Sequence, residues 1–382
     1  MAESLQRLRT GFVDLACSGH AFPEFAARAI RLLDSAVPVD AWCVMTADPV
    51  TLLITGAVGQ NLPTSEPDNA REFFRIEYSG EDFINFSDLA RTGTKVGVLS
   101  EATNGDLERS PRWRVLFGPA GLGDQLRTVC ADGSACWGYL AIHRKKSSPD
   151  FTRSEAKLVS AVSSQLAEGI RLSLLVEDVQ QETIPEGPGL ILLDDDLEVV
   201  GVNPAAERLL DQVLLDPDVE RTVPSAVFSV AALMRGLQDR GEVSATPKAR
   251  IKAASGRWLM AHATRLETPS GERKIAVIVE PAPPLEAGAI ALRSYRLTPR
   301  ELEVAELVLQ GFSTAEIAAE LVVSELTVQQ HLKGVFDKAK VRSRRELVSE
   351  VFTSQYLSRM MAGSKPSPQG WFVETDPSPG EP

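Results

Sequence analysis

Two short helices separated by only three residues are the feature that most constrains this chain. Thr314–Leu321 and Glu325–Ala339 have helical patterning, and Val322-Val323-Ser324 joins them. Ser313 begins a capping box for the first of these helices, and Ser324 can cap the second. Two capped helices on a turn this short are typical of a helix-turn-helix. We therefore expect this part of the chain to fold as a small helical domain.

Two more helix starts flank the pair. Thr298-Pro-Arg-Glu301 and Ser343-Arg-Arg-Glu346 are capping boxes, and the first has Pro at the first helical position, where no donor is lost. Gly311 stands where the helix after Thr298 must end in a left-handed turn. The pattern predicts an all-α domain of four helices over 297–352.

The third helix of this domain has two distinct faces. Apolar residues recur at steps of four, three and four, which predicts a buried stripe of Val328, Leu332, Val335 and Ala339. The opposite side carries Gln329, Gln330, Lys333 and Asp337. Gln can pair bidentately with adenine, and Lys can donate to guanine O6 or N7 in the major groove. The third helix is therefore predicted to read base edges.

The charge of the whole chain is a poor guide to this function. The 382 residues have a formal net charge of −12, which is unusual for a protein that binds DNA. Between Gln329 and Arg345, however, six residues are basic and only Asp337 is acidic. Local basic residues give affinity for phosphates without reading sequence. The complete predicted DNA-binding set is Thr314, Ser324, Thr327, Gln329, Gln330, Lys333, Lys338, Arg342 and Arg344, and Lys340 has the same basic character.

The C-terminal domain resembles a LuxR-type helix-turn-helix. The resemblance lies in Leu297-Thr-Pro-Arg-Glu-Leu-Glu-Val, Gly311-Phe-Ser-Thr-Ala-Glu-Ile-Ala, Leu321-Val-Val-Ser and Thr327-Val-Gln-Gln-His, about 55 residues in one register. It implies that Gln329, Gln330 and Lys333 occupy major-groove positions, and that the last helix, about Arg344–Phe352, supplies a dimer contact. A basic residue is usual in that family where Gln329 stands, and Gly is usual where Lys340 stands. The first departure concerns the base preference of the domain.

Residues 1–180 are predicted to form an α+β domain. Phe25–Ala36 has the spacing of an amphipathic helix, and Ala41–Met45 and Leu52–Val58 are short apolar runs split by a turn, as in adjacent strands. Leu126–Ala131 and Ala135–His143 flank Asp132-Gly133 as a hairpin. Thr152 and Glu155 form a capping box for a helix that is expected to run from about Arg153 to Gln180. With Trp113–Arg127 and Cys136-Trp-Gly, this segment resembles a GAF-type sensor domain.

Residues 186–282 are predicted to form a second α+β domain. Leu190–Leu193 and Glu198–Val202 form a hairpin around three aspartates, and Asn203-Pro204 caps a helix. Three further strands follow, and the unit resembles a PAS-type domain. The chain is thus expected to be multidomain, with two α+β sensor domains (GAF-like and PAS-like) before the four-helix domain. Residues 283–296 are the expected linker, and 353–382 form a tail rich in Pro, Gly and Ser that is expected to be disordered.

Both sensor folds enclose small apolar pockets, so a small-molecule effector is expected. The candidate lining consists of Trp42, Phe73, Phe83, Trp137 and Trp258, although each is also an ordinary core residue. We do not expect heme ligation by His20 or His143, or redox sensing by Cys130 and Cys136, because a lone His or Cys in a strand is usually a packing residue. Phosphorylation is not expected at Asp194-Asp195-Asp196 either, because these residues lie in a hairpin turn. No cofactor and no metal site is expected, because the cysteines lack CxxC spacing.

The sequence therefore predicts a regulator and not an enzyme, since no catalytic motif is present. We expect double-stranded DNA as a partner, a homodimer, an RNA polymerase contact, no membrane association and a cytoplasmic location. Two alternatives stay open: a signalling scaffold or small-molecule-binding sensor whose helix-turn-helix does not bind DNA, and an enzyme with a GAF-like fold and an unmarked site.

Overall fold

The computed structural model describes most of the chain. The described residues are 2–133, 135–175, 187–213, 223–242, 246–253, 258–267, 271–283, 288, 290, 292–348, 350–351, 365–366 and 372–373. The chain divides into two compact units, Met1–Ala282 and Pro283–Pro382, which are described separately below.

The first half of the N-terminal unit is a five-stranded antiparallel sheet with the order β2-β1-β5-β4-β3. Its strands are β1 (Ala41–Ala47), β2 (Ile54–Gln60), β3 (Val96–Val98), β4 (Leu122–Asp132) and β5 (Ala135–Lys145). Its helices are α1 (Ala2–Ala16), α2 (Phe22–Asp34), α3 (Pro67–Glu77), α4 (Phe86–Thr92), α5 (Leu99–Ala102) and α6 (Arg153–Leu175). Short helical turns lie at η1 (Pro63–Ser65), η2 (Leu107–Arg109) and η3 (Trp113–Phe117).

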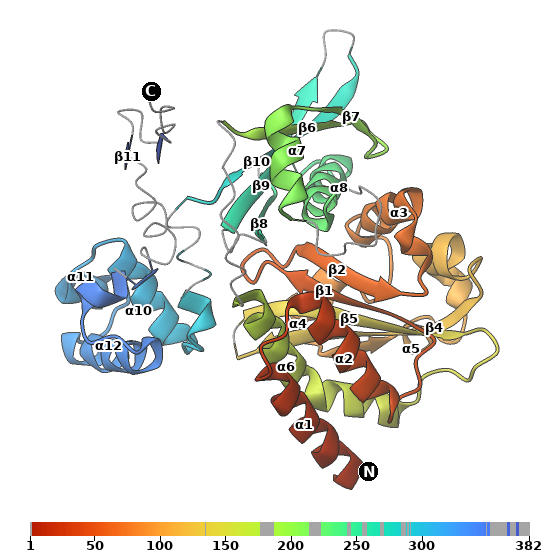
Figure 1. Ribbon diagram of the computed structural model, residues 1–382, viewed down its shortest axis with the longest axis horizontal. Coiled ribbons are helices and arrows are strands. Elements are labelled where there is room, and N and C mark those ends of the chain that lie inside the picture. Colours follow the sequence, from red (N-terminus) through yellow and green to blue (C-terminus); the bar gives the residue numbers. More distant parts are fainter. Residues whose placement is uncertain are drawn as a thin grey trace, which may run out of the picture. The chain divides into compact units, whose positions relative to one another are not determined.

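Helices α1, α2 and α6 pack together and cover one face of this sheet (Figure 1). Helix α2 has the predicted amphipathic face, with Phe25, Ala29 and Leu33 fully or nearly fully buried. Helix α6 begins at the predicted capping box, where the Thr152 N–H donates to Glu155 over 2.8 Å. The start of this helix is therefore confirmed, whereas its expected end at Gln180 lies outside the described residues.

The second half of the N-terminal unit is another five-stranded antiparallel sheet, with the order β7-β6-β10-β9-β8. Its strands are β6 (Gly189–Leu193), β7 (Val199–Val202), β8 (Lys248–Lys252), β9 (Trp258–Glu267) and β10 (Arg273–Pro281). Two helices accompany it, α7 (Pro204–Asp211) and α8 (Ser225–Asp239). The Asn203 side chain caps α7 by accepting from the Ala206 N–H, as the Asn-Pro pair predicts. The two predicted α+β regions are thus confirmed, while the GAF-like and PAS-like labels stay predictions.

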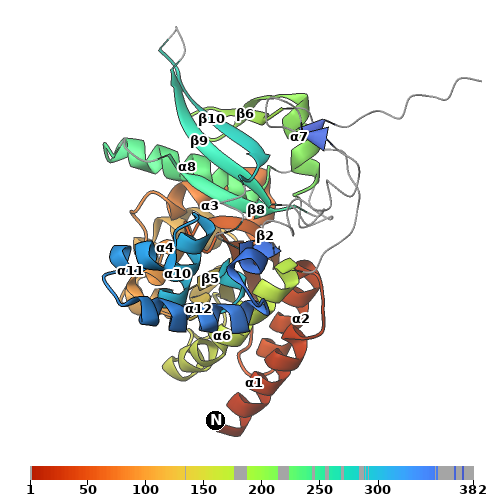
Figure 2. The same cartoon turned by 90° about the vertical axis from the view of Figure 1, so that its left-hand side faces the viewer.

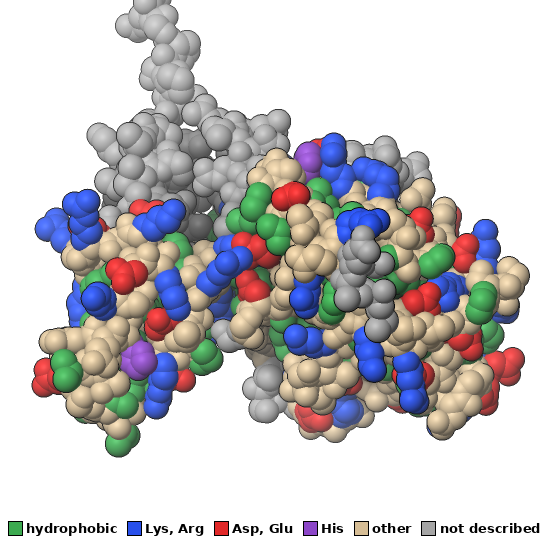
Figure 3. All heavy atoms as spheres, turned by 90° about the horizontal axis from the view of Figure 1, so that it is seen from below, with side chains coloured by type: hydrophobic (Ala, Val, Ile, Leu, Met, Phe, Trp, Pro, Cys, Tyr) green, Lys and Arg blue, Asp and Glu red, His purple; other side chains and the backbone are tan. Residues whose placement is uncertain are grey.

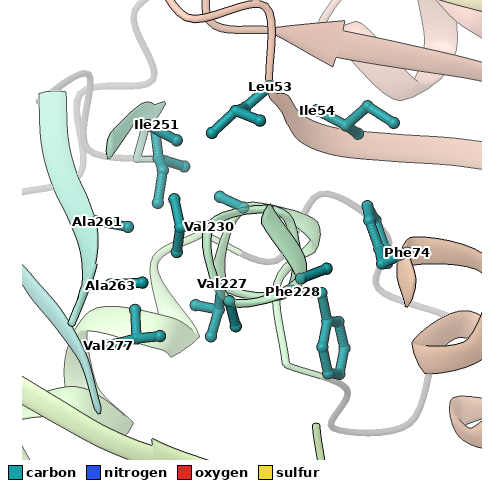
Figure 4. Packing of buried hydrophobic residues seen from close by; sticks show 14 of the residues in the cluster. Leu53, Ile54, Phe74, Val227, Phe228, Val230, Ile251, Ala261, Ala263 and Val277 are labelled. Carbon is teal, nitrogen blue, oxygen red and sulfur yellow. The ribbon is translucent and has the colours of Figure 1, made fainter. Parts of the chain in front are cut away.

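Helix α8, which the sequence analysis did not anticipate, packs against both sheets of the N-terminal unit. It contacts β8, β9 and β10 of the second sheet and β2 of the first (Figures 1 and 2). Figure 4 shows Phe228 turned toward Phe74, and Val227 and Val230 turned toward the second sheet. One hydrophobic core therefore runs through both halves of the unit.

Polar contacts join the same two halves. Asp48 accepts three hydrogen bonds from Arg250, two from its guanidinium and one from its backbone N–H, at 2.8–3.0 Å. The hydroxyl of Ser229 on α8 donates to the Ile54 carbonyl of β2 at 2.7 Å. Because these groups are buried, each needs its partner in the other half to be satisfied in the folded unit.

The C-terminal unit contains α10 (Pro299–Leu309), α11 (Thr314–Glu320) and α12 (Glu325–Ala339), and helical backbone again at 344–348 and 350–351. The C-terminal unit is helical, as expected, and helical backbone also occurs at 288, 290 and 292–294, within the segment expected to be a linker. A separate hydrophobic core includes Leu297, Val304, Ile317, Val328, Leu332, Val335 and Leu347. Most of the tail expected to be disordered lies outside the described residues; two short strands, β11 (Lys365–Pro366) and β12 (Phe372–Val373), pair within it.

Candidate nucleic-acid interface and internal cavity

Three N-caps fix the helices that form the candidate interface. Thr298 and Ser313 make complete capping boxes with Glu301 and Glu316, and the Ser324 side chain accepts from the Thr327 N–H. Each such cap stabilises its helix by about 1 kcal/mol, which is large for helices this short. Gly311 has φ 90°, the left-handed conformation predicted for it.

Helix α12 separates its residues into a buried face and an exposed face. Val328, Leu332, Val335 and Ala339 are all buried, as the spacing predicted. Gln329, Gln330 and Lys333 are exposed, and none of their side chains has a hydrogen bond or ion pair with another described residue. Three polar side chains with free donor or acceptor groups thus project from the middle of α12, between residues 329 and 333.

The hydroxyl groups of Thr314, Ser324 and Thr327 already form hydrogen bonds within the unit. Ser324 Oγ and Thr327 Oγ1 lie 2.8 Å apart, so one hydroxyl donates to the other. Thr314 Oγ1 accepts from Arg344 at 2.8 Å. A hydroxyl oxygen retains a second lone pair, so these side chains can still take part in a contact with another molecule.

Two of the predicted phosphate-binding residues make bonds inside the unit. Lys338 pairs with Glu301 of α10 at 2.5 Å. Arg344 donates to the Phe312 carbonyl at 2.7 Å as well as to Thr314. Lys338 therefore joins α12 to α10, and Arg344 fastens the last helix to the start of α11. Arg342, in contrast, is exposed.

Helix α12 ends at Lys340, which has φ 56° and ψ 35°. This left-handed conformation favours glycine, so a lysine here is under backbone strain. The side chain is exposed and carries its charge beside Arg342. On the face that Figure 3 shows, basic and acidic side chains are interspersed.

The N-terminal unit contains a cavity of about 210 Å³. Strands β1, β2, β4 and β5 line it together with Phe73 and Phe74 of α3 and Phe228 of α8. Of the five predicted pocket residues, Phe73 lies on this lining. The structure places Trp42, Phe83, Trp137 and Trp258 elsewhere: Trp42 donates to Gln60 and Trp137 to Asp132, while cations lie over the rings of Phe83 and Trp258.

The sequence analysis missed the polar residues of this cavity. Gln125, Arg127 and His143 line it, and all three are buried. Gln125 and Arg127 are two residues apart on β4 and so share one face of the sheet. The available signal for a site was a glutamine and an arginine at alternate positions of one strand. A charge that is buried in a strand needs a specific reason.

Burial makes three cysteines of the N-terminal unit, Cys43, Cys130 and Cys136, unreactive. Burial raises the pKa of Cys43 and of Cys136 to about 12, and it raises the pKa of Cys130 well above its usual value. Because the thiolate is the reactive form, these thiols are poor nucleophiles at neutral pH. Among the described residues, no group of three or more His, Cys, Asp or Glu side chains is placed to hold a metal ion. No described helix is both long enough and apolar enough to cross a membrane.

Comparison with known proteins identifies the C-terminal unit. The family described as bacterial regulatory proteins, luxR family, matches residues 295–351. The spore germination protein GerE of Bacillus subtilis (strain 168) is 46% identical over 55 residues, which are 14% of this chain and 74% of GerE. The HTH-type transcriptional regulator MalT of Serratia proteamaculans (strain 568) is 36% identical over 70 residues, which are 18% of this chain and only 7% of MalT.

The N-terminal unit has a weaker likeness to a solved structure. The VqsR LBD domain of Pseudomonas aeruginosa is 16% identical, covers 46% of this chain and 98% of its own, and superposes with a TM-score of 0.31. A score this low does not indicate a shared fold, so the family rests on the C-terminal match. That match spans most of GerE and includes every helix of the candidate interface. The chain therefore belongs to the LuxR family of bacterial regulatory proteins, as a transcriptional regulator with a C-terminal helix-turn-helix.

Proposed function

We propose that the C-terminal unit binds duplex DNA at specific sequences and that the chain controls transcription through this binding. One observation carries the proposal: α12 exposes Gln329, Gln330 and Lys333 while its opposite face is buried in the core. A helix held in this way can enter the major groove with its first half against the base edges. Gln329 and Gln330 suit adenine, and Lys333 suits guanine.

The basic residues after α12 are proposed to hold the DNA backbone. Arg342 and Lys340 are exposed and have no ion pair with another described residue. Contacts of this kind supply affinity that falls as salt rises. That Lys338 and Arg344 contact phosphates stays a prediction, and their bonds to Glu301, Phe312 and Thr314 give them a structural role besides.

We propose a homodimer as the DNA-binding form. The support is the resemblance to LuxR-type domains, in which the last helix supplies a dimer contact, and the helical backbone at 344–348 and 350–351 is in place for it. A two-fold symmetric dimer would bind a pseudo-palindromic site with half-sites about one helical turn apart. Contact with RNA polymerase remains a prediction.

A small-molecule effector of the N-terminal unit is the second part of the proposal. The cavity of about 210 Å³ favours it, because buried Gln125, Arg127 and His143 meet aromatic side chains there. A largely apolar pocket with a few converging polar groups is the usual form of a ligand site. The GAF-like and PAS-like descriptions of the two halves belong to this proposal.

The DNA-binding proposal is tested by selecting sites from a randomised duplex library with the full chain. Binding to the selected duplex is then measured by fluorescence anisotropy at about 50 and 200 mM salt, and affinity should fall by roughly 10³-fold or more if about six phosphates are contacted. A scaffold that does not bind DNA would enrich no sequence and would show no binding at either salt concentration.

A further inference from the structure

The cavity in the N-terminal unit has a polar end, and its chemistry limits what can bind there. This inference rests on the proposed small-molecule binding and specifies the ligand class. Strand β4 contributes Gln125 and Arg127, and the neighbouring β5 contributes His143. Gln125 and His143 are paired across the two strands, so the three side chains form one group.

Two of the three guanidinium nitrogens of Arg127 donate hydrogen bonds, and the third has no partner among the described residues. Its Nη1 donates to Glu77 at 2.6 Å, and its Nε donates to Gln125 Oε1 at 3.2 Å. The guanidinium lies over the Phe86 ring, 4.1 Å from the ring centre. Its Nη2 is buried and has no hydrogen-bond partner among the described residues. A fully buried arginine therefore offers a fixed and unused donor beside the cavity.

His143 presents a second unused donor. Because Gln125 Oε1 accepts from Arg127, the amide nitrogen of Gln125 faces His143 Nε2, 3.2 Å away, and donates to it. The ring proton is then on Nδ1, which is buried and has no partner among the described residues. Burial and the charges of Arg127 and Arg112 lower the pKa of His143 to about 3, so the ring is neutral near pH 7.

The charges around this group cancel. Arg112 and Arg127 are buried with Glu77 and Asp82, in ion pairs of 2.6–3.1 Å. An anionic ligand would therefore add a buried charge without a counter-ion, which is costly. A cationic or donor-only ligand would face two N–H groups that it cannot satisfy. A neutral acceptor can satisfy such a donor without adding a charge.

The aromatic part of the lining favours an apolar ring, although the lining also includes polar side chains, namely Thr55, Gln60, Asn61, Thr64, Ser65 and Ser225. Phe73, Phe74, Phe86, Phe117 and Phe228 line the cavity. A dry cavity of about 150 Å³ can hold benzene, so 210 Å³ suits one substituted ring. We propose that the cavity binds a small, uncharged ring compound whose carbonyl oxygen or ring nitrogen accepts a hydrogen bond from Arg127 Nη2 or His143 Nδ1.

The test uses four probes built on one ring: toluene, acetophenone, benzoate and benzylamine. Their binding to the full chain is measured by calorimetry at pH 7. Acetophenone should bind at least tenfold more tightly than toluene, because it satisfies a buried donor that includes a charged group. Benzoate and benzylamine should bind more weakly than acetophenone.

Variants then distinguish the loss of a hydrogen-bond donor from a loss of folding. Either His143→Phe or Arg127→Lys, whichever removes the donor that the ligand uses, should bring the acetophenone affinity toward that of toluene. His262→Phe, the same histidine exchange on β9 and off the lining, should leave both affinities unchanged. Ala141→Leu, which fills the cavity from β5, should weaken every probe at least tenfold and serves if a donor variant does not fold.

The outcomes distinguish this inference from the function on which it rests. Equal affinities for toluene and acetophenone, or tighter binding of benzoate, would overturn the neutral-acceptor ligand while leaving small-molecule binding in place. Failure of all four probes to bind would overturn both. Neither result bears on DNA binding by α12.

Discussion

At the level of single residues, burial determines which side chains of the N-terminal unit can be charged or reactive. His143 is 1% exposed and lies beside two arginines, so its protonated form is strongly disfavoured. Cys130 and Cys136 are buried on adjacent strands and carry raised pKa values. The sequence could show that these residues exist in strands, but their surroundings come from segments far away in the chain.

The buried histidine makes stability depend on pH. In the unfolded chain His143 titrates near its ordinary pKa of about 6.5, whereas in the folded chain the pKa is lowered to about 3. Protons therefore bind the unfolded state preferentially, and stability is lost as pH falls from about 6.5 toward 3. At pH 5 the loss should be about 2 kcal/mol relative to pH 7.

Urea denaturation of the N-terminal unit at pH 7 and pH 5 measures this loss. His143→Phe should reduce the difference between the two pH values by about 2 kcal/mol. His262, which is partly exposed, serves as the matched control. An unchanged difference in the His143 variant would show that the ring is not held neutral.

The strained Lys340 gives a second prediction. Lys340→Gly should stabilise the C-terminal unit by about 0.5–1 kcal/mol, because glycine adopts φ 56° without a steric penalty. Hydrogen exchange of the buried amides of α12 reports the change. Lys340→Ala removes the same charge but keeps the strain, so it should give no gain; a gain from both variants would point to charge and not to strain.

At the scale of secondary-structure elements, sequence patterns predicted the helices and hairpins well where local chemistry dictates them. The caps at Thr298, Ser313 and Ser324 each formed as expected, and the β4–β5 hairpin turns at Gly133, whose φ is 54°. Helix α8 was missed because its apolar residues do not keep a single stripe. That helix is buried on several sides because it lies between two sheets. Its apolar residues therefore surround the helix and do not follow a helical period.

The contact between the last helix and α11 can be tested with adjacent arginines. Arg344→Ala should lower the stability of the C-terminal unit by about 1.5–3 kcal/mol, since its charged hydrogen bonds to Phe312 and Thr314 are lost. Arg345→Ala removes an equal charge from an exposed site and should change stability by less than about 0.5 kcal/mol. Equal losses would mean that the Arg344 contacts do not fasten the helices.

At the scale of the whole molecule, the chain consists of an N-terminal unit with two sheets and a helical C-terminal unit. One hydrophobic cluster of the N-terminal unit includes residues of both sheets, which predicts that both sheets unfold together. The sequence indicated two α+β segments correctly. It could not show that they share a core, because Asp48 and Arg250 are about two hundred positions apart and neither stands out alone.

Breaking the buried pair should destabilise both halves at once. Asp48→Ala should cost about 3–5 kcal/mol, because the Arg250 charge remains buried without its carboxylate. Hydrogen exchange should show β1–β5 and β6–β10 losing protection in parallel. Glu198→Ala removes the exposed ion pair with Arg71, which also joins the halves, and should cost less than about 1 kcal/mol. Loss of protection in only one sheet would show that the halves unfold independently.

The central claim is that the exposed face of α12 reads DNA sequence. Its most direct test is the affinity of Lys333→Ala for the selected duplex and for a scrambled duplex of equal length, measured at one salt concentration. We expect Lys333→Ala to lose about 1–3 kcal/mol of binding free energy on the selected duplex and much less on the scrambled one. Equal losses on both duplexes, or none on either, would contradict the assignment of α12 as the reading helix.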